Sequence, residues 1–167
     1  LQLDALSTGQ LAALRTDQVN ALTTDQVASL RTAAIAALTT LQVQALDAEQ
    51  LDALTSDQVQ SLTNGQVQSL TSDQLASLSA LQLSTFTTAQ FNALSTEQIG
   101  ELSTAQIAGL DTVQVGGLTT TTFGAFLAPQ VTALTTEQVQ ALTSLVIRSE
   151  EHTSELQSHS FIAYAVF

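Results

Sequence analysis

Carboxylates are the only side chains in residues 1–147 that could serve as general acids or bases. This stretch contains no His, Lys, Cys, Tyr, Trp or Met, so the other groups that usually transfer protons in enzymes are missing. Two carboxylates could cleave a glycosidic bond, and acids could bind calcium. No P-loop, H-E-x-x-H, EF-hand or G-x-S-x-G motif occurs. The sequence predicts no enzyme and no catalytic, cofactor-binding or metal-binding residue.

The positions of the acids follow an eight-residue repeat, which we call the octad. A large apolar residue, the anchor, recurs every eight residues from Leu6 to Leu142. A second apolar residue follows five residues after each anchor, and Gln precedes it in most octads. The consensus is L-[ST]-T-x-Q-[VIL]-x-[AS]. Acids eight residues apart do not form one calcium site, so the regular spacing favours a structural role for them.

Each octad carries the signals of a helix N-terminus. In Leu22–Ser29, Thr23 and Gln26 have the spacing of a capping box, and Leu22 and Val27 occupy the positions of a hydrophobic staple. Asp25 lies in the first turn, where the helix dipole favours an anion. The same position holds Asp17, Glu49, Asp57, Asp73, Glu97 and Glu137. The N-cap pattern is broken by Arg15, Arg31 and Leu127, and the Gln pattern by Ala34, Thr122 and Val146.

These signals predict an all-α solenoid over residues 1–147, with one short capped helix per octad. A single long helix is excluded, because successive anchors would rotate by about 80° around its axis. Helices of this length are marginal alone, so neighbouring octads must stabilise one another. A β-solenoid is the alternative, since Thr and Val favour strands. Apolar spacings of five and three are not the alternation of a strand.

Two stretches need separate interpretation. Between residues 116 and 129, three of the seven Gly residues and the only Pro replace consensus residues. We interpret this stretch as a decayed repeat with a local bend, or else as a binding notch. The aromatic pair Phe86 and Phe91 is interpreted as a larger staple.

The tail, residues 148–167, is predicted to be non-native. The octad ends at Ile147, and RSEEHTSELQSH after it resembles a translated sequencing adapter. His152 and His159 lie there, so we do not interpret them as metal ligands. Because the repeat is already in phase at Leu1, we expect residues 1–147 to be a fragment of a longer array.

Composition narrows the possible partners. The net charge is -12 and Lys is absent, so binding to nucleic acid or to an anionic membrane surface is not expected. Membrane insertion is not expected either, because the chain contains no apolar run of about 18 residues. Without Cys, there is no disulfide framework.

Residues 1–147 resemble the octapeptide arrays, of the LTTxQVxAL type, in very long bacterial proteins that are often labelled adhesins or haem-utilisation proteins. The resemblance implies a spacer or stalk in a secreted or cell-surface protein, with neighbouring repeats of the same longer chain as partners. Axial haem ligands are missing from the array, so no cofactor is expected. The alternative function is a binding surface for ice, glycan or protein, formed by the Thr rows, although the same Thr are expected to cap helices.

Overall fold

The chain forms a run of short helices at eight-residue intervals. The computed structural model describes residues 7–142. Sixteen helices of five or six residues lie within this range, and a further one covers residues 136–142. The sixteen are α1 (Thr8–Ala12), α2 (Thr16–Asn20), α3 (Thr24–Ala28), α4 (Thr32–Ala37), α5 (Thr40–Gln44), α6 (Ala48–Asp52), α7 (Ser56–Ser61), α8 (Asn64–Gln68), α9 (Ser72–Ser77), α10 (Ala80–Ser84), α11 (Thr88–Ala93), α12 (Thr96–Glu101), α13 (Thr104–Ala108), α14 (Thr112–Gly116), α15 (Thr120–Gly124) and α16 (Ala128–Thr132).

The prediction of an all-α solenoid is confirmed, and the β-solenoid alternative is wrong, since no strand occurs in residues 7–142. The strand preference of Thr and Val is overridden by the position of each residue in the octad. Most Thr residues stand at the N-cap or in the first turn, where the hydroxyl bonds to the backbone or faces solvent, and Val at the second apolar position points into the core.

Each helix ends without a left-handed residue. Across the described range no residue has a positive φ, Gly included. Instead, the anchor amide donates to the carbonyl three residues earlier, as Leu30 does to Val27 at 3.1 Å. The following N-cap is extended, with φ -67 and ψ 149 at Arg31, and the next helix begins. This explains why the repeat needs no glycine at its turns.

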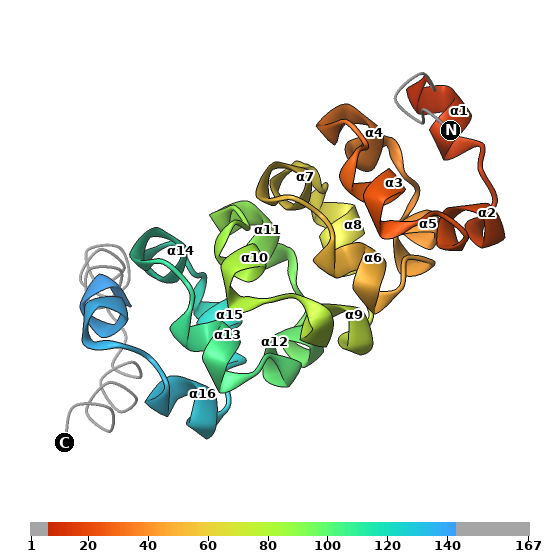
Figure 1. Ribbon diagram of the computed structural model, residues 1–167. Coiled ribbons are helices and arrows are strands. Elements are labelled where there is room, and N and C mark those ends of the chain that lie inside the picture. The colour runs from red at the N-terminus through yellow and green to blue at the C-terminus, as the bar shows by residue number, and fades with distance from the viewer. Residues whose placement is uncertain (1–6, 143–167) are drawn as a thin grey trace.

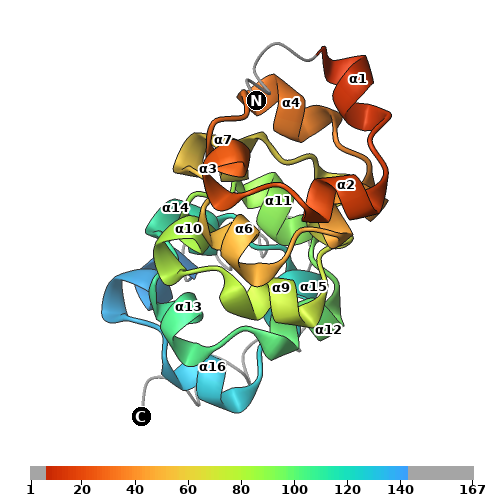
Figure 2. The same cartoon turned by 45° about the vertical axis from the view of Figure 1, so that its right-hand side comes forward.

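The helices wind into a solenoid with between three and four octads per turn. Helices three octads apart pack together, such as α1 on α4, α6 on α9 and α8 on α11. Side-chain bonds also join residues 28–31 positions apart, which is close to four octads. The coil runs from one end of the molecule to the other, and α1, α4, α7, α11 and α14 follow one another along one edge (Figure 1). A turned view shows the same succession from α1 to α16 (Figure 2).

The two apolar columns form one continuous core along the solenoid. In the second column, Val27, Leu51 and Ile107 have an exposed fraction of 0%. Anchors such as Leu62 and Leu102 lie beside them and are also buried. Full burial of one such side chain contributes about 1.5–3 kcal/mol. Phe86 and Phe91 belong to the same core, so they are packing residues in an enlarged octad.

Two glycines offer a matched test of this packing. A methyl group at Gly100, inside α12, would meet no atom within 4 Å, whereas one at Gly109 would lie 2.7 Å from Cβ of Ala80. We expect Gly100→Ala to raise the free energy of unfolding by about 0.5–1 kcal/mol, because Ala is the better helix former. Gly109→Ala is expected to lower it by about 1–3 kcal/mol through overpacking. Urea unfolding of both variants measures the difference, and equal effects would contradict the packing of α13 on α10.

Candidate functional site

The hydroxyls at the N-caps are engaged in helix capping. Thr63 Oγ1 accepts from the backbone N–H of Gln66 at 3.2 Å, and Gln66 Oε1 accepts from the backbone N–H of Thr63 at 2.7 Å. Most octads repeat this reciprocal pair. Arg15, Arg31 and Leu127, which break the sequence pattern, have no side-chain cap. The N-cap hydroxyls therefore serve the fold.

The glutamine that completes each cap also reaches the previous turn of the solenoid. Gln66 Nε2 donates to the carbonyls of Ile35 at 2.9 Å and Leu38 at 2.7 Å. These are among the last carbonyls of α4 and its following loop, which an isolated helix leaves without a donor. One amide thus bonds to the start of one helix and to the end of another, four octads earlier.

Twelve glutamines repeat this arrangement, and we call them the glutamine ladder. Each donates to an anchor carbonyl 28 residues earlier at 2.6–3.3 Å. Their exposed fractions are only 2–7%. The members are Gln42, Gln50, Gln58, Gln66, Gln74, Gln82, Gln90, Gln98, Gln106, Gln114, Gln130 and Gln138.

Sequence reasoning assigned these glutamines to capping and missed their second bond. A signal for it was present. A capping box accepts Glu as readily as Gln at this position, yet no octad has Glu there, although Glu49 and Glu97 stand one residue earlier in their octads. A carboxylate accepts hydrogen bonds but cannot donate them. The exclusion of Glu therefore indicates a required donor.

In ten of the sixteen helices α1 to α16, a Thr occupies the first helical position, directly after the N-cap. Thr16, Thr96 and Thr104 are exposed, and their hydroxyls make no hydrogen bond within the described residues. The expectation that both Thr columns are consumed by capping is therefore wrong for this column. In the stack of α3, α6, α9 and α12, this position holds Thr24, Ala48, Ser72 and Thr96, so Ala48 interrupts the row of hydroxyls. Packed helices also lie about 8–10 Å apart.

Most acids of the described residues lie on the surface in first turns, whereas Asp52 and Glu101 are the last residues of α6 and α12. Asp25, Glu49, Asp73 and Glu97 stand at the same position of α3, α6, α9 and α12, which stack on one another, so they form a stripe along the solenoid. Within residues 7–142, no group of three or more His, Cys, Asp or Glu side chains could hold a metal ion. His152 and His159 lie outside the described residues.

One exposed ion pair perturbs a carboxylate. Arg15 Nη2 lies 2.8 Å from Asp17 Oδ2. The hydrogen bond from Arg15 lowers the pKa of Asp17 below its ordinary value. Both side chains are largely exposed, so the pair contributes little to stability.

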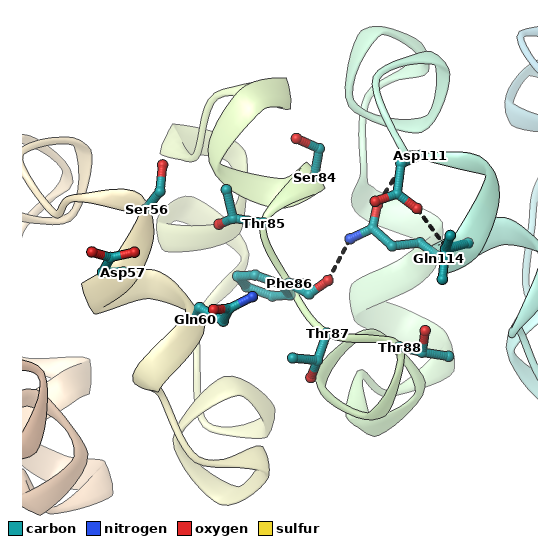
Figure 3. A pocket seen from close by; sticks show the side chains of 11 residues that line it. Ser56, Asp57, Gln60, Ser84, Thr85, Phe86, Thr87, Thr88, Asp111 and Gln114 are labelled. Carbon is teal, nitrogen blue, oxygen red and sulfur yellow. Dashed lines mark hydrogen bonds between the residues drawn. The ribbon is translucent and has the colours of Figure 1, made fainter.

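An open groove of about 450 Å³ lies between α7, α10, α11 and α14. Figure 3 shows its polar lining, in which Asp111 caps Gln114 and Gln114 donates to the Phe86 carbonyl at 2.6 Å. The Phe86 ring is buried and offers no stacking surface. Four lining side chains make no hydrogen bond within the described residues: Ser56, Asp57, Gln60 and Thr88.

The groove can form hydrogen bonds with a polar ligand, but its chemistry is limited. Of its two carboxylates, Asp111 accepts from the Gln114 backbone N–H at 2.6 Å, while Asp57 is exposed. Asp111 therefore serves as an N-cap, and Asp57 is the one acid among the lining residues that makes no hydrogen bond within the described residues.

The irregular stretch keeps the octad fold. α15 forms with Thr119 as its cap, and α16 accommodates Pro129 in its first turn. The rings of Phe123 and Phe126 pack together with centroids 5.5 Å apart. In the α15 octad, Thr122 stands at the position of the ladder glutamine, and its hydroxyl lies 2.8 Å from Thr119 Oγ1.

Comparison with known proteins identifies a repeat. The family model described as ALTTAQ repeat matches residues 1–32, 30–64 and 67–104. No curated protein and no solved structure matches the chain. Among residues 7–142, no helix is long and apolar enough to cross a membrane.

Proposed function

This chain belongs to the ALTTAQ repeat family, and from that premise we propose that it is a spacer or stalk in a secreted or cell-surface bacterial protein, without catalytic activity. The glutamine ladder is the observation that carries the proposal. Each turn bonds to the turn before it through side chains that the octad supplies, so the solenoid can be lengthened by whole octads. Repeat arrays of this kind grow without a fixed size.

The distribution of polar groups supports the same proposal. N-cap hydroxyls, ladder amides and the Asp111 carboxylate all bond to the backbone of the chain. The remaining polar groups lie along a regular surface that repeats with the octads. A spacer requires a stable length, and these contacts support that requirement.

A duplication within the chain tests the spacer function. Repeating residues 31–78 after Leu78 adds 48 residues, or six octads, in phase. At about 8–10 Å per turn, the maximum dimension from solution X-ray scattering should increase by roughly 12–20 Å. A control insertion with four further residues shifts the ladder out of register and should broaden the distance distribution. A rounder particle of unchanged length would contradict the proposal.

A binding surface for a glycan or a protein is the second candidate. The exposed hydroxyls of the first helical position, which include Thr16, Thr96 and Thr104, favour it because the fold does not use them. Regular ice contact is disfavoured by their wide spacing and by residues without a hydroxyl at the same position, such as Ala48 and Ala80. Screening the chain on a glycan array, alongside a variant with Thr96→Ala and Thr104→Ala, separates the candidates. A glycan that binds the chain and loses affinity for the variant would support this second function.

A further inference from the structure

The glutamine ladder has one gap inside the described solenoid. Gln114 and Gln130 bond to the previous turn on either side of it, but Thr122 stands at the position between them. By the ladder spacing, a glutamine here would donate to the carbonyls of Phe91 and Leu94. The shorter Thr122 side chain bonds instead to Thr119 in its own octad.

Asn92 replaces part of the missing bridge. Its Oδ1 accepts from the Thr119 backbone N–H at 3.0 Å, and its Nδ2 donates to the Gly117 carbonyl at 2.9 Å. The first bond satisfies the amide that a ladder glutamine would have satisfied. The Leu94 carbonyl receives no side-chain hydrogen bond within residues 7–142, so the bridge between turns is reduced.

Packing is also looser from this point onward. Phe123 is partly exposed, whereas the preceding members of the same column, such as Ile107 and Val115, are 0% exposed. Leu127 provides no side-chain cap for α16. These features coincide with the ladder gap and are independent of it.

We propose that the gap at Thr122 sets a boundary between two cooperative units, so that residues 119–142 open together while the preceding turns remain folded. In a repeat array, stability is approximately the sum of unit and interface contributions, and opening extends to the weakest interface. If the chain is a spacer under tension, residues 119–142 would extend before the preceding turns. This consequence rests on the proposed spacer function. The boundary itself does not depend on that function.

Two single substitutions in α15 test the proposal on the full chain. In Thr122→Gln, the new amide can reach the Phe91 and Leu94 carbonyls. Asn20 and Gln50 have the same separation as Asn92 and residue 122, and they show that the two side chains are compatible. The Asn20 side chain donates to the Ala45 carbonyl, while the backbone carbonyl of Asn20 accepts from the Gln50 side chain. Thr120→Gln is the matched control, since residue 120 is exposed at the first helical position.

Amide hydrogen exchange, followed by mass spectrometry, is the measurement. In the original chain, residues 119–142 should exchange together and at least tenfold faster than residues 95–118. Thr122→Gln should slow exchange across 119–142 by about tenfold, and Thr120→Gln should leave it unchanged. Asn92→Ala should accelerate exchange in the same segment. A gradual increase in rate with no step near residue 119, or equal effects of the two glutamine variants, would overturn the boundary. Neither result would affect the scattering test of the spacer.

Discussion

Replacing Gln66 by Glu is expected to lower the free energy of unfolding by about 3–5 kcal/mol at pH 7, the scale of an uncompensated buried charge. The substitution preserves size and the capping bond to Thr63. It replaces the donor that faces the Ile35 and Leu38 carbonyls, at 2.9 and 2.7 Å, by an anionic oxygen. Because residue 66 is only 2% exposed, water cannot solvate the charge or the abandoned carbonyls.

The loss should shrink at low pH. Burial and the two carbonyls favour the neutral form of the introduced carboxyl group, so its folded-state pKa in the Gln66→Glu variant lies above the unfolded value of about 4.3. Stability is then greatest below the unfolded pKa and is lost as pH rises through the folded pKa. Urea titrations of the variant at pH 4 and pH 7, each compared with the original chain, measure this change.

Gln10→Glu is the control for the ladder substitution. Gln10 is exposed, and its Oε1 accepts from the Ser7 backbone N–H at 2.8 Å, but its Nε2 makes no bond within the described residues. Glu can retain that capping bond, so we expect a change below about 0.5 kcal/mol. If Gln66→Glu cost no more than this control, the ladder would have no energetic importance.

Phe91→Ala is expected to cost about 3–5 kcal/mol, the usual range for truncating a buried Phe. Phe91 is 0% exposed and fills the second apolar column in α11. We expect the cavity to stay largely open, because hydrogen bonds hold the neighbouring turns in place. Thermal and urea unfolding, monitored by circular dichroism, measure the loss.

The same substitution at Phe123 provides the comparison for Phe91. Phe123 occupies the same column in α15 but is partly exposed, so Phe123→Ala should cost only about 1–2 kcal/mol. Phe91→Leu should also be milder than Phe91→Ala, because Leu83 fills this column in the preceding octad. Equal losses for Phe91→Ala and Phe123→Ala would contradict the uneven packing along the core.

Local features of the fold were predictable from sequence. The order of Thr23, Gln26 and Val27 encodes a helix start and a buried position within one octad, and the helices follow that order. Even the missing caps at Arg15 and Leu127 could be read from residue type. These predictions succeed because capping and staple contacts join residues three to five positions apart.

The winding and the ladder were not predictable in the same way. The bonds from Gln66 to Ile35, and from Asn92 to Gly117, join residues 31 and 25 positions apart. Those separations depend on how many octads complete a turn, which the packing of helices decides and a single octad does not encode. The groove beside Asp57 and Asp111 arises from the same winding, because its walls come from successive turns.

The ladder also has a direction. Each of the twelve ladder glutamines donates to carbonyls that precede it in the chain, as Gln138 does to Leu110. During synthesis, the acceptors for each new octad have therefore already been made when its glutamine is added. At about 5–20 residues per second, a ribosome adds an octad roughly every 0.4–1.6 s. The array can thus fold as it is translated, with the last completed turn serving as the template for the next.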